Sequence, residues 1–138
     1  MRTVEKDAYA YLTITSDTLS LNDISTFLDM PPDGSSWSLG DTRKITNTLR
    51  PKYEFSRWSL SSGISKGECL EAHLVALTVR MSPLSQKLYD LPKQMNGSIS
   101  ITGWVEDYTD QLRFSAGTLR EIGGFGLPLD FDLYSEND

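Results

Sequence analysis

The sequence predicts an α+β fold in a single domain: a mostly antiparallel sheet of about six strands, with one long central helix and two or more short helices packed on it. The length of 138 residues is about that of one domain. Several segments alternate apolar and polar residues with the period of two that is typical of half-buried strands. One central segment instead repeats apolar residues at helical spacing. We therefore treat residues 1–138 as one domain with an ordered core of about 8–134.

The first strand is predicted at residues 9–15, where Ala10, Leu12 and Ile14 share one face. A short helix follows. Ser20 and Asp23 have the spacing of a capping box, in which each side chain satisfies the other's backbone N–H. Pro31 ends this helix, because the residue before a proline avoids helical dihedral angles.

The segment 70–90 has the strongest helical pattern in the chain. Its apolar residues recur at steps of four and three and define one face: Leu70, Leu74, Leu77, Met81, Leu84 and Leu88. Pro83 interrupts this pattern, so we expect a long helix to about Met81, a kink or break, and a short second helix to about Asp90.

Further elements are expected throughout the rest of the chain. The predicted strands are residues 37–41, 53–60, 98–105, 111–114 and 127–133, with 98–105 and 111–114 as a hairpin. Ser115 is expected to cap a short helix that runs to about Ile122. Pro128 cannot donate a hydrogen bond to a neighbouring strand, so it predicts the start of the last strand or an edge position.

Charge and composition exclude several functions. With 13 Lys and Arg against 19 Asp and Glu, the net charge of −6 argues against binding to a nucleic-acid backbone. No apolar run approaches the roughly 20 residues of a membrane-spanning helix, and residues 1–7 lack the apolar stretch of a secretory signal, so we expect a cytoplasmic protein. A single cysteine and a single histidine exclude an internal disulfide and a site with two histidine ligands.

Four short motifs, taken in order, resemble a known family. They are residues 39–41 (LGD), 58–60 (WSL), 70–74 (LEAHL) with Leu77, and 125–134 (FGLPLDFDLY). Together they resemble the domain-of-unknown-function family four-two-seven-nine (DUF4279), a family of small, mostly bacterial domains, over roughly Tyr9 to Tyr134. The resemblance implies a compact α+β domain without established activity, and it assigns no catalytic residue.

Three residues are candidates for catalysis. Asp130 and Asp132 are expected on one face of the last strand, about 7 Å apart from a rise of about 3.3 Å per residue. Such a pair suits an inverting glycosidase or a divalent cation, but it also suits a solvated sheet face. His73 could act as a general base, or it could be a half-buried histidine bonded to a loop carbonyl. One hypothesis is therefore a small hydrolase or metal-dependent enzyme that uses these three residues.

Aromatic residues suggest a different function. Tyr9 and Tyr11 lie on the polar side of the first strand, and Trp104 is expected to point away from the apolar side of its own strand. If these strands are neighbours, an aromatic surface results, and such surfaces are enriched at protein interfaces. The alternative is that residues 33–52 cover this face. With Asp130, Asp132 and Tyr134, these three aromatic residues are the candidate binding surface.

The leading hypothesis is a non-catalytic protein-binding module that needs no cofactor and no metal. Its acidic charge suits an unidentified, basic protein partner, and an inhibitor or immunity-type protein is one case of this. We expect no nucleic-acid or membrane partner, and a monomer or homodimer. A third hypothesis is a structural or dimerising component without a ligand.

Overall fold

The computed structural model describes residues 8–42, 51–105 and 113–135. Four strands, four α-helices and one 3₁₀ helix lie in these residues. In chain order they are β1 (Tyr9–Ser16), α1 (Leu21–Leu28), β2 (Ser56–Ser61), α2 (Leu70–Met81), η1 (Ser82–Leu84), α3 (Ser85–Tyr89), β3 (Asn96–Val105), α4 (Ala116–Gly123) and β4 (Leu129–Ser135). The fold is therefore α+β with a single sheet, as predicted.

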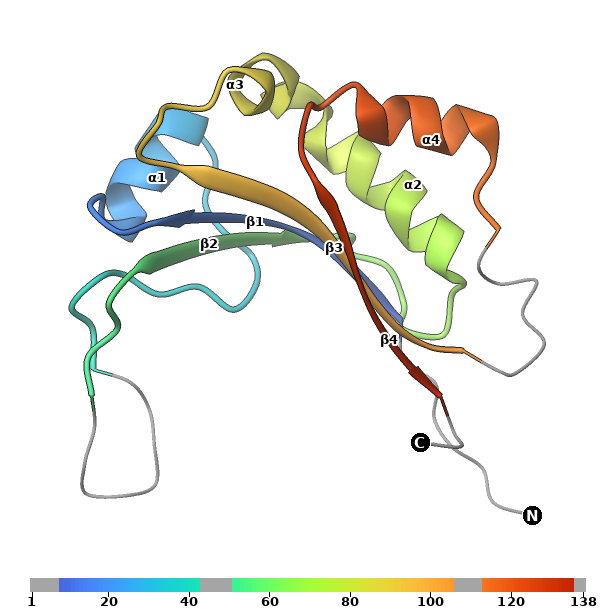
Figure 1. The fold of residues 1–138 in the computed structure, drawn as a ribbon, viewed down its shortest axis with the longest axis horizontal. Coiled ribbons are helices and arrows are strands. Elements are labelled where there is room, and N and C mark those ends of the chain that lie inside the picture. The colour runs from blue at the N-terminus through green and yellow to red at the C-terminus, as the bar shows by residue number, and fades with distance from the viewer. Residues whose placement is uncertain (1–7, 43–50, 106–112, 136–138) are drawn as a thin grey trace.

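The sheet has the strand order β2-β1-β3-β4. Strand β1 is antiparallel to both of its neighbours, whereas β3 and β4 are parallel. The α-helices all lie on one side of this sheet (Figure 1). Because parallel strands cannot be joined by a tight turn, the chain crosses from β3 to β4 through the segment that contains α4.

The prediction of about six strands is wrong for the described residues, which form four. Residues 37–41 contribute only an isolated bridge between Trp37 and Arg57. Arg113 and Phe114 lie outside any strand, and the rest of the predicted segment 111–114 is outside the described residues. Within the described residues, β3 pairs with β1 on one side and with β4 on the other.

The predicted break at Pro83 is confirmed, although no single long helix spans the segment 70–90. The segment is divided into the 12-residue α2, the 3₁₀ helix η1 with Pro83 in its first turn, and the short α3. Proline has no N–H and its ring crowds the preceding turn, so the α-helical hydrogen bonds cannot continue through it. The six apolar side chains of the predicted face are nevertheless all buried, none more than 2% exposed.

The predicted capping box at the start of α1 is confirmed. The backbone N–H of Asp23 donates to Oγ of Ser20 (3.1 Å), and the backbone N–H of Ser20 donates to Oδ2 of Asp23 (3.0 Å). The helix ends at Leu28, before the prolines, because Asp29 takes a left-handed conformation with φ of 54°.

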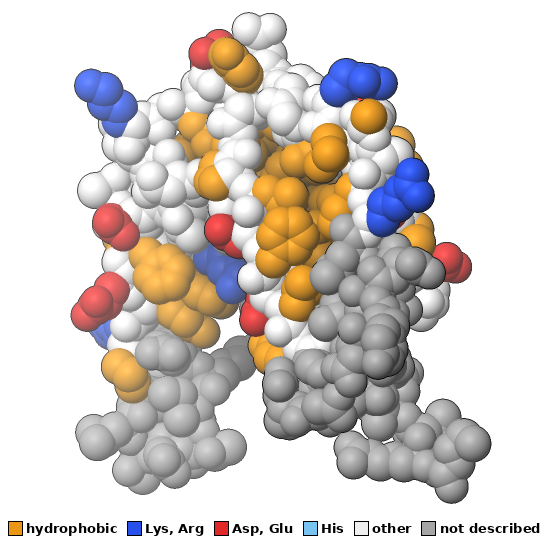
Figure 2. Space-filling model, turned by 45° about the vertical axis from the view of Figure 1, so that its right-hand side comes forward, with side chains coloured by type: hydrophobic (Ala, Val, Ile, Leu, Met, Phe, Trp, Pro, Cys, Tyr) orange, Lys and Arg blue, Asp and Glu red, His pale blue; other side chains and the backbone are white. Residues whose placement is uncertain are grey.

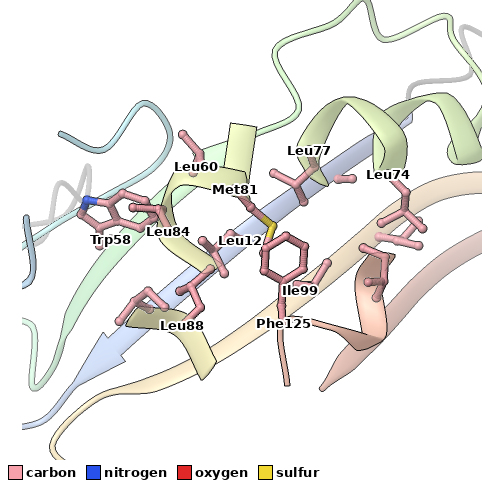
Figure 3. Close-up of a cluster of buried hydrophobic side chains, with 14 of the residues drawn as sticks. Leu12, Trp58, Leu60, Leu74, Leu77, Met81, Leu84, Leu88, Ile99 and Phe125 are labelled. Carbon is pink, nitrogen blue, oxygen red and sulfur yellow. The ribbon is translucent and has the colours of Figure 1, made fainter. Parts of the chain in front are cut away.

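The core lies between the sheet and the helices. Figure 3 shows Leu74, Leu77 and Met81 of α2 directed at the strands, where Leu12 and Ile99 meet them. All five side chains are fully buried. At the other end of the core, the indole N–H of Trp58 donates to the carbonyl of Met30 (3.1 Å), so its one polar group is satisfied.

Among the described residues, no helix combines the length and the apolar character needed to cross a membrane.

Candidate functional site

The register of the strands assigns every side chain to one of two faces. Leu12, paired with Leu60 and Ile99, lies on the face that packs against the helices. Successive side chains of a strand point to opposite sides, so Tyr11 lies on the other face. We call this second face, opposite the helices, the polar face.

All six residues of the predicted binding surface occupy positions on the polar face. Three rows of the register cross the neighbouring strands β1, β3 and β4 there. They are Tyr11–Ser100–Asp130, Tyr9–Thr102–Asp132 and, on β3 and β4 alone, Trp104–Tyr134. The side chain of Trp104 is not among those that the structure describes, so only its position in the register is known. The structure thus brings together residues that are more than a hundred positions apart in the chain.

The described members of this set differ in exposure. Asp130 and Asp132 are exposed, Tyr134 is 44% exposed and Tyr9 is 36% exposed, whereas Tyr11 is half-buried. A protein that bound this face would therefore meet carboxylates and tyrosine rings before it met backbone.

One hydrogen bond connects two of the candidates. Oη of Tyr134 donates to Oδ2 of Asp132, at 3.0 Å. The bond and the negative charge of Asp132 both favour the protonated phenol, so they raise the pKa of Tyr134 above its ordinary value of 10.0. Tyr134 is therefore a neutral hydrogen-bond donor at physiological pH.

Cationic side chains that were not predicted from the sequence lie over both tyrosines of β1. The guanidinium of Arg57 lies 5.6 Å from the ring centre of Tyr11, and the ammonium of Lys66 lies 5.5 Å from that of Tyr9. Distances of this size allow a cation–π attraction. The alternation in β2 could have placed Arg57 on the polar face. Trp58 and Leu60 are buried on the helix side, and Arg57 points to the opposite side.

The described part of the segment 33–52 covers the β2 end of the polar face and the edge of β2. The backbone N–H of Asp33 donates to the carbonyl of Ser59 (3.0 Å), and Trp37 pairs with Arg57. Ser59 is only 2% exposed, since Ser36 bonds to its N–H and Gly34 lies against its side chain. The carboxylates on β4, three strands away, are exposed.

Aromatic side chains gather at that same covered end. Trp37 stacks on Tyr53 with ring centres 4.4 Å apart, and Phe55 meets it edge-on at 5.5 Å. These residues line a hollow of about 450 Å³. Arg57 lies over Trp37 at 5.3 Å, so the indole contacts both a stacked ring and a cation.

His73 and the candidate carboxylates lie on opposite sides of the sheet. His73 belongs to α2, is 1% exposed, and its Nδ1 is 2.6 Å from Oγ of Ser62. Burial lowers the pKa of His73, although the carbonyl of Ser65 and the charge of Glu68 oppose this. The histidine packs on the helix side, whereas Asp130 and Asp132 lie on the polar face, so the sheet separates them.

The described residues also offer little for a metal ion. Among residues 8–42, 51–105 and 113–135, no three His, Cys, Asp or Glu side chains come together in the way that a metal site requires. Cys69, the single cysteine, is exposed at the N-cap of α2 and makes no capping bond through its side chain.

Comparison with known proteins gives one match. The model of a family described as a domain of unknown function (DUF4279) matches residues 6–136. No curated protein and no solved structure matches the chain.

Proposed function

The chain belongs to the DUF4279 family, which is a domain of unknown function, and we propose that it is a non-catalytic protein-binding module whose contact surface is the polar face over β1, β3 and β4. The observation that carries this proposal is the strand register. It aligns Tyr9 with Asp132, Tyr11 with Asp130 and Trp104 with Tyr134. Tyr and Trp are enriched among the few residues that supply most of the binding energy at protein interfaces.

The charge of the chain supports a basic partner. The net charge is −6, and both carboxylates of the proposed surface are exposed. Opposite charges accelerate association and orient the two proteins before contact. One such partner is a basic protein that the module inhibits by covering its surface, as an immunity-type protein does. We propose the cytoplasm as the compartment of this complex.

The hydrolase hypothesis is the weaker one. It requires His73 to share a cavity with Asp130 and Asp132, because a general base acts only within hydrogen-bond reach of the reacting group. The described positions of these residues, on opposite sides of the sheet, favour the binding module instead.

Affinity capture with matched variants tests the proposal. The bait proteins are the wild type, the double variant Asp130→Asn/Asp132→Asn, and the control Asp90→Asn/Glu121→Gln. The control removes the same charge from two exposed carboxylates on the helix side of the molecule. We expect mass spectrometry to identify a protein that the wild type and the control retain and that the polar-face variant loses. If all three baits retain the same proteins, or if the control loses them equally, the polar face is not the contact surface.

A further inference from the structure

Strand β4 forms one edge of the sheet. Within the described residues it pairs with β3 alone, whereas β1 and β3 each have two neighbours. The backbone N–H and C=O groups on the outer side of an edge strand can accept another strand. Natural proteins usually block such an edge, for example with proline, and here Pro128 stands just before β4 rather than within it.

The helix-side surface of β4 is apolar and incompletely covered. Phe131 is 50% exposed, although Ile101, its register partner on β3, is fully buried. Helix α4 packs against α2, and its Leu119 is 52% exposed. Figure 2, in which the right-hand side of Figure 1 comes forward, shows hydrophobic side chains gathered near the centre of the view. The ring of Phe131 already meets that of Phe114, with centres 6.2 Å apart, and an added strand would bury more of Phe131.

The other surface of β4 is acidic. Asp130 and Asp132 alternate with Leu129, Phe131 and Leu133, so one side of the strand is apolar and the other carries two exposed carboxylates. A strand added at this edge places its own alternate residues directly beside those of β4. The complementary segment therefore alternates apolar residues with Lys or Arg.

A second copy of this chain does not meet that requirement. An antiparallel pair of β4 strands with Phe131 opposite Phe131 would place Asp130 opposite Asp132 of the other copy. An antiparallel pair centred on Asp132 would place Asp132 opposite Asp132 of the other copy. Like charges directly opposite each other in a sheet are destabilising. The carboxylates therefore act against self-association and favour a basic segment.

We propose that β4 binds an extended segment of a basic protein partner as a fifth strand, with apolar residues of the segment against Phe131 and basic residues against Asp130 and Asp132. This inference rests on the proposed function and adds to it the chemistry and the conformation of the bound segment. Backbone hydrogen bonds supply affinity in such strand addition, and the alternating side chains supply specificity.

A synthetic peptide tests strand addition directly. The probe is a seven-residue, end-capped peptide that alternates Lys and Val. One control peptide has the same composition with the lysines and valines in two blocks, and another alternates Glu and Val. Fluorescence anisotropy measures the dissociation constants, and amide hydrogen exchange followed by NMR locates the bound peptide. We expect the alternating Lys–Val peptide to bind about tenfold more tightly than either control and to slow exchange of β4 amides.

The same variants show which residues the peptide contacts. Asp130→Asn/Asp132→Asn is expected to weaken binding about tenfold, and Asp90→Asn/Glu121→Gln to leave it within about twofold. Equal binding of all three peptides, or binding without protection of β4 amides, overturns strand addition. Concentration-dependent self-association that protects β4 also overturns it, in favour of a second copy. If the peptide experiment fails but the capture experiment gives the expected result, strand addition is wrong and the proposed function stands. If the capture experiment fails, both proposals are wrong.

Discussion

Nδ1 of His73 and Oγ of Ser62 lie 2.6 Å apart inside the core, and this hydrogen bond joins α2 to the residue that follows β2. Both side chains are at most 5% exposed. The sequence predicted a half-buried histidine bonded to a loop carbonyl. The structure buries it fully and adds the hydroxyl of Ser62, while the carbonyl of Ser65 also acts on the ring. Nε2 of the same ring is buried without a hydrogen-bond partner, which makes a second proton on the ring costly.

Stability should therefore fall in mild acid. Because burial lowers the pKa of His73 below its ordinary value of 6.5, the unfolded chain binds a proton at this residue more readily than the folded one. The free energy of unfolding should decrease as the pH falls from 7.5 to 5.5, and urea unfolding at several pH values measures it. His73 is the single histidine, so His73→Gln should show a smaller decrease over this range. An equal decrease in both proteins would contradict a neutral, buried imidazole.

Glu71 of α2 should stabilise the start of α4. Its Oε1 accepts the backbone N–H of Ser115 (3.1 Å) and the hydroxyl of Thr118 (2.9 Å). Hydrogen bonds from the side chains of Ser115 and Thr118, and then from the Ser115 backbone, lower the pKa of Glu71 below its ordinary value of 4.5. Glu71→Gln is expected to lower the thermal midpoint at pH 7, as measured by circular dichroism. A depressed carboxyl pKa contributes stability that is lost as the pH falls through the folded value, so the difference from the wild type should shrink below pH 4.5.

Glu121→Gln provides the control for that comparison, because Glu121 is an exposed carboxylate on α4 itself. Its thermal midpoint should follow that of the wild type at every pH. If the thermal midpoints of Glu71→Gln and the wild type differed by the same amount down to pH 2, the charge of Glu71 would not be the source of its stabilising effect.

Leu77→Ala should be strongly destabilising. Leu77 is fully buried between α2 and the sheet, and truncation of a buried leucine removes apolar contacts and leaves a cavity (Figure 3). We expect a loss of about 2–5 kcal/mol in the free energy of unfolding, measured by urea denaturation. Val79→Ala in the same helix is the control. Val79 is 69% exposed, so this change should cost about 0.5 kcal/mol or less. Similar losses for the two variants would mean that α2 does not bury Leu77.

Asp132→Asn should change the titration of a neighbour while leaving the fold stable. Asp132 is exposed, so the substitution should change the free energy of unfolding little. A loss above about 2 kcal/mol would contradict this, because it would mean that the side chain is buried and paired. Its charge helps to raise the pKa of Tyr134, and the substitution should bring that pKa down toward 10.0. NMR of ¹³C-labelled tyrosine follows the titration. Asp130→Asn, on the same strand but without a bond to Tyr134, should leave the pKa of Tyr134 unchanged.

Features that depend on neighbouring residues could be predicted from the sequence. The capping box of Ser20 and Asp23 spans four residues, and the buried face of α2 follows from a spacing of three and four. The position of Pro128 before an edge strand also followed from local chemistry, because proline lacks the N–H that a central strand needs.

Features that depend on long-range pairing could not be predicted. The sequence alone does not show that β4 lies beside β3. Parallel strands are joined by a long crossover connection, and no short turn motif marks their pairing. For the same reason Ser62 could not be identified as the partner of His73, nor Trp37 as the partner of Arg57. The candidate surface itself was proposed from the alternation within single strands, and only the register shows which of its residues are neighbours.

The central position of β1 has a consequence for how this chain folds. β1 spans Tyr9–Ser16, but its two partners begin only at Ser56 and Asn96. The entropy of closing both long loops must be overcome before these contacts form, and topologies dominated by such distant pairings refold in milliseconds to seconds rather than microseconds. Until both partners arrive, the apolar side of β1 is exposed to solvent, so this strand is vulnerable to aggregation during synthesis and refolding.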